Sequence, residues 1–401
     1  MPWFRHIVLV AIGILFSTQS GLAKTLMLST RDYDGGFVAK STLQQRLRQL
    51  NKLATDSDDQ VLIASTDPKS QALAQTYQAL QVFSTQLETQ WIRDIAVGWS
   101  PTWHQFWMHS DAITKTFGQD LHQKMYGASW QNQIEDSLHI QGGEVVSSPD
   151  GHICIAHRMI DSKQAAMDDI LGCTTWITLP PMPSPYTHIN DHIDLWVGFV
   201  GPQQVVLADI VPEQCKKRAG FLYTWYDPAR PAYIEMNHTF KAYRDKIKAM
   251  LVKHNLEVLD LPLAFGCVDF LSDLPMKHWS KQLAKKPVLT VHDYQKLLYP
   301  SLYTHGHEGI NVVIRSYTNA VAMQDHWLIP VFYPLEQKNI FGQMQRKPMV
   351  PALQHMYQHE SKSLHKTIKN LALPKKVLYM PIPEQQVRQG GAFRCLTLET
   401  Q

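Results

Sequence analysis

The chain has 401 residues, enough for one large domain or two of average size. Its formal net charge of +3, without a long Lys/Arg run, is too mild to favour nucleic-acid binding. A hydrophobic content of 44% with 11 tryptophans excludes a disordered chain and indicates a packed globular body.

The N-terminus has the layout of a signal peptide. A positively charged start precedes the apolar stretch 7–16, and the small residues Gly21 and Ala23 stand at −3 and −1 of a cut before Lys24. The apolar run is shorter than the ~20 residues of a spanning helix. We therefore expect removal of residues 1–23, export to the periplasm or beyond, and no stable membrane insertion after cleavage. An uncleaved anchor is the alternative.

Downstream, short apolar strands alternate with amphipathic helices. Strands are expected at 25–29, 61–65, 91–97, 145–148, 152–160, 174–179, 193–200, 204–210, 256–265, 311–315, 326–333, 376–380 and 393–398. Helices are expected around 43–53, 71–82, 162–171, 240–251 and 351–371. This pattern predicts an α/β fold. No linker or compositional step marks a boundary, so residues 24–401 are expected to form a single domain. No glycine-rich nucleotide loop opens a helix, so the usual signature of a dinucleotide or phosphate cofactor is lacking.

The chain has five cysteines, an odd number. Outside the cytoplasm thiols tend to pair. If Cys154, Cys173, Cys215 and Cys267 form two bridges, in one of three possible connectivities, Cys395 is left as the free thiol. Alternatively, all five are buried and unpaired.

Four short segments carry candidate chemistry. They are Trp91-Ile92-Arg93-Asp94, Gln141-Gly142-Gly143-Glu144, His192-Ile193-Asp194 with Phe199, and Gly390-Gly391-Ala392-Phe393-Arg394-Cys395-Leu396-Thr397. In this order and at these separations they resemble the agmatine deiminase and bacterial peptidylarginine deiminase family of the guanidino-group-modifying (pentein) superfamily. Ser316-Tyr317-Thr318-Asn319 is similar to that family as well. The resemblance implies a five-bladed, pseudo-symmetric α/β-propeller with its active site in the central channel, and no metal or organic cofactor.

The chemistry of a guanidinium fits these residues. A carboxylate can accept two parallel N–H bonds from this planar cation, and Asp94 and Asp194 are the candidates. On a strand, residues two apart point the same way, so His192 and Asp194 would face one cavity. His192 could protonate departing ammonia. A neighbouring imidazolium would also help to keep Cys395 as thiolate.

The resemblance implies that Cys395 attacks the guanidino carbon, ammonia leaves, and water hydrolyses a thiouronium intermediate to a ureido product. Trp91, Arg93 and Gly143 join the two aspartates as candidate substrate-binding residues. In the alternative interpretation, Trp91 is a core aromatic and Arg93 is an ion-pair partner of a carboxylate. The expected partner is a small-molecule or peptide guanidino substrate: agmatine, free arginine or peptidyl arginine.

The sequence also departs from the family pattern. Gln141 stands where a Glu commonly precedes the Gly-Gly pair. After the Trp-x-Arg-Asp motif, Ala96-Val97 stand where the family commonly has Gly-Pro. Arg394 stands where a His commonly precedes the nucleophile. This added cation could hold a thiolate or an acidic substrate group, or face solvent. Two other functions stay open: transfer of the amidino group to an amine, and guanidine binding without turnover.

Overall fold

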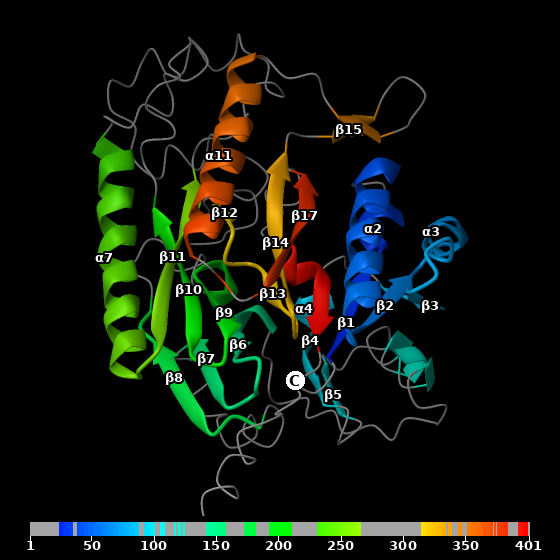
Figure 1. Ribbon diagram of the computed structural model, residues 1–401, viewed down its shortest axis with the longest axis horizontal. Coiled ribbons are helices and arrows are strands. Elements are labelled where there is room, and N and C mark those ends of the chain that lie inside the picture. The colour runs from blue at the N-terminus through cyan, green and yellow to red at the C-terminus, as the bar shows by residue number, and fades with distance from the viewer. Residues whose placement is uncertain are drawn as a thin grey trace, which may run out of the picture.

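The computed structural model is a mixed α/β protein (Figure 1). It describes residues 24–34, 38–87, 92–100, 105–108, 116–117, 119–121, 123–124, 142–157, 172–181, 192–210, 231–265, 314–333, 336–338, 344–346, 351–371, 373, 375–383 and 392–399. The helices are α1 (Arg31–Asp34), α2 (Lys40–Asp56), α3 (Pro68–Ala74), α4 (Ile92–Ile95), α7 (Pro231–Lys253) and α11 (Pro351–Asn370), with the short 3₁₀ helices η1 (Gly142–Glu144), η4 (Ile193–Leu195) and η7 (Arg394–Leu396).

The strands of the described residues form six small sheets. They are β1 (Thr25–Ser29), β2 (Gln60–Ser65), β3 (Gln81–Ser84), β4 (Ala96–Ser100), β5 (Gln105–Met108), β6 (Val145–Ser147), β7 (Ile153–His157), β8 (Thr175–Leu179), β9 (Val197–Gly201), β10 (Gln204–Ile210), β11 (Glu257–Phe265), β12 (Ile314–Ser316), β13 (Val321–Ala322), β14 (His326–Tyr333), β15 (Glu336–Lys338), β16 (Met344–Arg346), β17 (Lys376–Pro383) and β18 (Thr397–Glu399).

One arrangement of strands recurs in four of these sheets. A first strand pairs antiparallel with a second, and the second pairs parallel with a third, in the sets β18-β1-β2, β6-β7-β8, β9-β10-β11 and β13-β14-β17. A parallel pair needs a long crossover, and α2, α7 and α11 supply it in three of the four. An antiparallel pair also joins β4 and β5.

A short turn precedes the first strand of each unit. η7 leads into β18, η1 into β6, η4 into β9, and residues 316–320 into β13, while α4 leads directly into β4. These turns contact one another: α4 touches η7 and η1, and η1 touches η4. The repeated unit therefore brings turns that are far apart in the sequence to one place in the structure.

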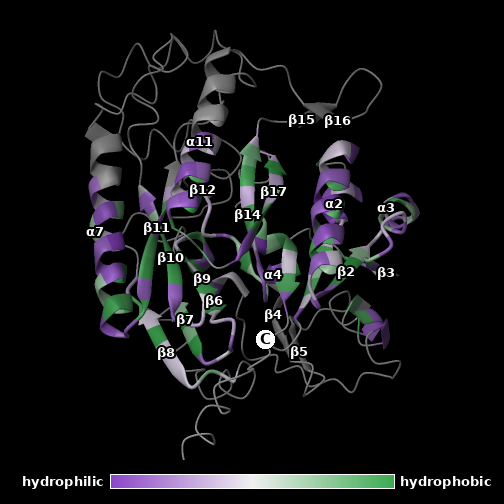
Figure 2. Cartoon of the chain, in the orientation of Figure 1, coloured by the Kyte–Doolittle hydropathy of each residue, from purple (hydrophilic) through white to green (hydrophobic). Residues whose placement is uncertain are grey.

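The three long helices lie between the sheets. α2 contacts β2 and β17, α11 contacts β14 and β11, and α7 contacts β10, β11 and β8 (Figure 1). The leucine spacing predicts α2, because it places Leu43, Leu47, Leu50 and Leu53 on one face of a helix. In the structure these four residues are fully buried. The strands beside these helices carry the apolar residues of the core (Figure 2).

The structure confirms most of the expected elements and corrects four of them. The helix expected at 71–82 begins instead at Pro68, capped by Asp67, and has ended before β3. The strands expected at 91–97, 193–200 and 393–398 each begin as a helical turn, namely α4, η4 and η7. Apolar composition favours strand in all three, but contacts with distant residues fix the turns. Ser316 Oγ, for example, donates to Leu195 O at 2.5 Å.

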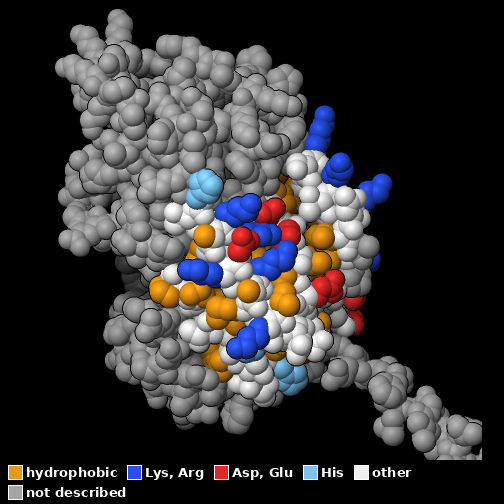
Figure 3. All heavy atoms as spheres, turned by 90° about the vertical axis from the view of Figure 1, so that its left-hand side faces the viewer, with side chains coloured by type: hydrophobic (Ala, Val, Ile, Leu, Met, Phe, Trp, Pro, Cys, Tyr) orange, Lys and Arg blue, Asp and Glu red, His pale blue; other side chains and the backbone are white. Residues whose placement is uncertain are grey.

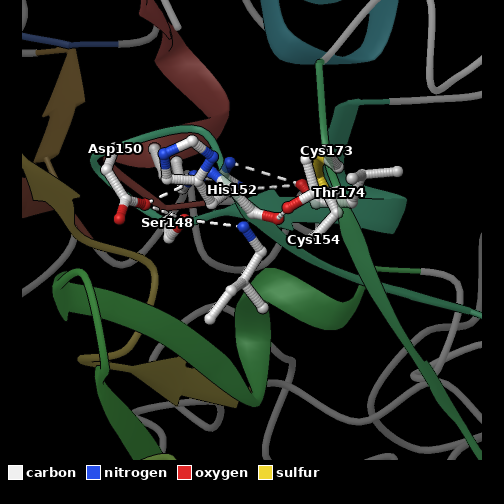
Figure 4. The surroundings of a disulfide bond; sticks show 9 residues. Ser148, Asp150, His152, Cys154, Cys173 and Thr174 are labelled. Atoms are coloured by element: carbon white, nitrogen blue, oxygen red, sulfur yellow. Dashed lines mark hydrogen bonds between the residues drawn. A yellow bond between two sulfur atoms is a disulfide. The ribbon is translucent and has the colours of Figure 1, made fainter.

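One disulfide joins β7 to the residue that approaches β8. Cys154 and Cys173 are bonded (Figure 4). Cys395 is buried and takes no part in a disulfide. The neighbouring turn is held by Ser148, whose Oγ accepts from the backbone N–H of Ile153 at 2.9 Å. The alternative in which all five cysteines are unpaired is therefore wrong, and of the three expected connectivities only one contains this bridge. Cys215 and Cys267 lie outside the described residues.

Charged side chains of both signs gather around α7 and the strands beside it, on the face that Figure 3 shows. Arg244 pairs with Asp209 at 3.1 Å and with Asp245 at 3.0 Å, and Asp260 joins Arg244 to Lys248. Within the part of the chain that the structure describes, no helix combines the length and the apolar character that crossing a membrane requires. Residues 1–23 and the helix expected at 162–171 lie outside it.

Candidate active site

The candidate site lies where the short turns meet. Cys395 belongs to η7, Asp194 to η4 with His192 directly before it, and Gly143 to η1. Asn319 follows β12 in the turn that leads to β13. The thiol sulfur, one carboxylate oxygen and one ring nitrogen of Cys395, Asp194 and His192 all lie within 4.8 Å of one another. Three residues of the sequence hypothesis are therefore assembled in one cluster.

The expected geometry of His192 and Asp194 was wrong in one respect. They do not lie on a strand, because His192 is the residue before the 3₁₀ helix and Asp194 is inside it. A hydroxyl from a distant turn supports this helix: Thr318 Oγ1 donates to Asp194 O at 3.3 Å. The two side chains still converge on Cys395, because η4 and η7 are leading turns of different strand units that meet through η1 and α4.

Cys395 is held by an amide side chain. Cys395 is 1% exposed, and its sulfur accepts a hydrogen bond from Asn319 Nδ2 at 3.4 Å. The oxygen of the same amide accepts from the backbone N–H groups of Arg394 at 2.8 Å and Cys395 at 3.4 Å. Asn319 therefore fixes both the backbone of η7 and the sulfur. An amide N–H that points at the sulfur favours a thiolate over a thiol as its acceptor.

Asp194 offers a carboxylate in a buried setting. Its residue is fully buried, and Cys395 Sγ lies 3.9 Å from Oδ2. Arg394 Nη1 donates to the same oxygen at 3.3 Å. The other oxygen, Oδ1, has no hydrogen-bond partner among the described residues. A buried carboxylate oxygen normally has a donor, so Oδ1 is suited to accept an N–H from a bound molecule.

Behind the sulfur lies a group of buried charges. Glu399 Oε1 receives Arg93 Nη2 at 3.1 Å and Arg394 Nη2 at 3.2 Å. Both arginine side chains are at most 5% exposed. Arg394 also donates to the carbonyl of Val145 from Nη1 and Nη2, at 3.4 and 3.3 Å. Arg394 is therefore part of the interior and does not face solvent.

The charges in this group set one another's ionisation. Burial alone would raise the pKa of Glu399, but Arg93, Arg394 and Lys24 outweigh it and lower that pKa to about 2. Burial alone would lower the pKa of Arg394, but Glu399 and Asp194 outweigh it and raise that pKa. For Arg93, burial and then the charge of Arg394 lower the pKa. Glu399 is accordingly an ionised carboxylate between two cations.

The remaining predicted residues divide into two sets. Arg93 is paired with Glu399, as the ion-pair alternative has it, and Gly143 lies against the ring of His192. Asp94 has its backbone in α4, but its side chain lies outside what the structure describes, as do Trp91, Gln141 and the Gly390-Gly391 pair.

Sequence reasoning missed Asn319 and Glu399. Asn319 stands in a segment that carried part of the family resemblance, so its position was noted without a role. Glu399 lies four residues after Cys395 and had no motif to mark it. A glutamate directly after the apolar strand expected at 393–398 is the one signal that could have drawn attention to it.

Cysteine, histidine and carboxylate are also metal ligands by type. In the described part of the chain, His192, Asp194 and Cys395 are the set whose donor atoms converge closely enough to be considered for a metal ion. Three ligands of this kind would suit zinc. Without a metal, the same three side chains offer a nucleophile, a proton donor and an acceptor for N–H groups. An experiment with a chelator distinguishes a metal site from a metal-free one.

Solved structures share this fold. A cysteine-to-serine agmatine deiminase of C. jejuni with substrate bound aligns with a TM-score of 0.53 at 14% identity, covering 94% of this chain and 92% of that one. An agmatine deiminase of Enterococcus faecalis aligns with a TM-score of 0.54 at 11% identity, covering 94% and 92%. The chain has the agmatine deiminase fold. A Porphyromonas gingivalis protein assigned as an arginine deiminase aligns with a TM-score of 0.52 at 12% identity, covering 94% and 95%.

The resemblance noted in the sequence is thus confirmed at the level of the fold. The sequence itself matches no protein-family model and no curated protein. The described residues of the motifs that carried the resemblance lie in the short turns of this chain and the strands after them, and these turns hold the residues of the cluster.

Proposed function

We propose that this chain is a cysteine-dependent hydrolase that deiminates a guanidino group. The observation that carries the proposal is the convergence of Cys395, His192 and Asp194, with the unsatisfied oxygen of Asp194, in a chain with the agmatine deiminase fold. A thiolate, a proton donor and an acceptor for guanidinium N–H groups are the parts that the reaction needs.

The reaction follows from these groups. A guanidinium N–H donates to Asp194 Oδ1, and the Cys395 thiolate attacks the guanidino carbon to form a C–S bond. His192 gives a proton to a terminal nitrogen, the C–N bond breaks, and ammonia leaves a thiouronium on the sulfur. Water then adds to that carbon and gives one proton back to His192. As the C–S bond breaks, the added hydroxyl gives its other proton to solvent, and a ureido product leaves the thiolate behind. Asp94 is the candidate for a second carboxylate on the guanidinium.

The proposal extends to the architecture. Residues 24–401 would form one five-bladed α/β-propeller domain, with the turns at its centre. Four repeated units support this, together with the pair β4-β5 that follows α4 in the same way. The pairing of β18 with β1, from opposite ends of the chain, would close the ring. Removal of residues 1–23 would make the enzyme an exported one.

The substrate class is agmatine, free arginine or peptidyl arginine, without metal or organic cofactor. The test is ammonia release by the purified chain, starting at Lys24, from agmatine, arginine and an arginine-containing peptide. Release should stop in Cys395→Ser and His192→Asn and persist in His365→Asn, a control at an exposed histidine of α11. A chelator should leave the rate unchanged.

Two results would contradict the proposal. Loss of activity with the chelator, restored by zinc, would make the cluster a metal site. A lack of ammonia release from all three substrates would also count against hydrolysis. If an amidino-transfer product then forms when an amine acceptor is added, the enzyme is an amidinotransferase. Binding of arginine without either product would make it a guanidine-binding protein.

A further inference from the structure

The carboxylate of Asp194 lies between a cation and the nucleophile. Its Oδ2 is 3.3 Å from Arg394 Nη1 and 3.9 Å from Cys395 Sγ. All three groups are buried. Like charges at this separation in a site of low dielectric repel strongly. Without a compensating cation, the carboxylate would keep Cys395 in its neutral thiol form.

We propose that Arg394 keeps Cys395 ionised by neutralising Asp194, and that it is a positioning residue with this task in place of the histidine that commonly precedes the nucleophile. A guanidinium stays charged across the physiological pH range, whereas an imidazole does not. The thiolate would therefore not depend on a protonated His192. This inference deepens the proposed function, since it concerns the nucleophile of the same reaction.

The side chain of Arg394 is fixed for this task. One terminal nitrogen contacts Asp194, the other contacts Glu399, and both donate to the carbonyl of Val145. This planar fork, 4% exposed, leaves the guanidinium little freedom. The earlier alternatives, in which the cation faces solvent or holds an acidic group of the substrate, do not fit a side chain whose donors are already used inside the protein.

The negative charge of Glu399 offsets part of the positive charge that Arg394 and Arg93 place near Cys395. Glu399 accepts from Arg394 and from Arg93, whose charges both act on Cys395. In the described residues the charged or titratable groups around the sulfur are thus His192, Asp194, Arg394, Arg93 and Glu399, with Lys24 acting on Glu399. Removing Arg394 and removing Glu399 should shift the ionisation of Cys395 in opposite directions. A role in folding alone would not give opposite signs.

The experiment measures the ionisation of Cys395 directly. The ultraviolet absorbance of the thiolate is titrated with pH in each variant and in the same variant with Cys395→Ser, and the difference isolates this one sulfur. Arg394→Gln should raise the midpoint by about one pH unit or more. Glu399→Gln should lower it. Arg394→Lys, which keeps the charge but not the fork, should lie between the wild type and Arg394→Gln.

A matched control is Arg244→Gln, which breaks an arginine–carboxylate network between α7 and the strands β10 and β11. It should leave the midpoint unchanged. An unshifted midpoint in Arg394→Gln, or shifts of the same sign in Arg394→Gln and Glu399→Gln, would overturn the inference. If Arg394→Gln does not fold, Glu399→Gln decides alone, because an unchanged or raised midpoint there contradicts it.

These outcomes are separate from the proposed function, because the titration needs no substrate. Opposite shifts in a protein that deiminates nothing would leave the inference standing and the function rejected. Deimination without a shift of the titration midpoint would leave the function standing and the inference rejected. In an active enzyme, Arg394→Gln should also move the acidic limb of the kcat/KM profile to higher pH.

Discussion

Gly143 lies so close to His192 that a β-carbon on Gly143 would come within 2.3 Å of Nδ1 of the imidazole. Only a residue without a side chain leaves the ring where it is. Gly143→Ala should therefore displace the ring from Cys395 and reduce kcat at least about tenfold, as misplacement of a catalytic group does. Steady-state kinetics with a melting curve test this. Gly201→Ala, whose β-carbon meets only the flexible end of Gln204, is the matched control and should be near neutral.

Replacement of Asn319 by an acidic residue should impair catalysis. Asn319→Asp keeps an oxygen for the N–H groups of Arg394 and Cys395 but replaces the N–H that points at the sulfur with a second carboxylate oxygen. The added negative charge should disfavour the thiolate and lower kcat by about tenfold or more. Asn51→Asp is the control, because Asn51 also accepts a backbone N–H through its amide oxygen. Full activity in Asn319→Asp would contradict the assigned role.

Glu399 should stabilise the fold above acidic pH. Its pKa falls from an ordinary 4.5 to about 2, so the folded chain binds this proton more weakly than the unfolded chain. The contribution, on the order of 3 kcal/mol, is complete above the ordinary pKa and is lost as the pH falls towards 2. Urea unfolding at a series of pH values should give a flatter acid dependence for Glu399→Gln. Glu257→Gln, at an exposed glutamate, should keep the wild-type slope.

The bridge between Cys154 and Cys173 should contribute about 3 kcal/mol, as a disulfide that closes a loop of this size does. The double variant Cys154→Ala/Cys173→Ala should melt at a lower temperature and lose its dependence on reductant. Calorimetry with and without reductant measures both effects. An equal fall in the melting temperature of wild type and double variant on reduction would show that another bridge is responsible.

We expect the mature chain to begin at Lys24. The backbone nitrogen of Lys24 lies 3.0 Å from Asp59 Oδ1, so cleavage before this residue would turn a hydrogen bond into an ion pair with a buried carboxylate. N-terminal sequencing of the exported protein tests the cut. A chain extended by one alanine should be less stable than one that begins at Lys24, and Asp59→Asn should remove that difference.

Much of the local structure was predictable. β1, the leucine face of α2, and the strands β10 and β14 follow from apolar spacing alone, since burial of one face depends on residues near in sequence. The candidate residues Cys395, His192 and Asp194 were likewise named from short motifs. In contrast, η4 and η7 were predicted as strands, because their apolar residues also suit a strand and their helical turns depend on partners far along the chain.

The sequence by itself determined the class of fold, a candidate nucleophile and the chemistry that its neighbours could support. Only the tertiary structure decided which residues surround that nucleophile. Asn319 reaches Cys395 from 76 residues away and Asp194 from 201. No periodic pattern encodes contacts at such separations. They arise because the repeated strand units bring their leading turns to one place, where the buried charges of Arg394 and Glu399 must be balanced by one another.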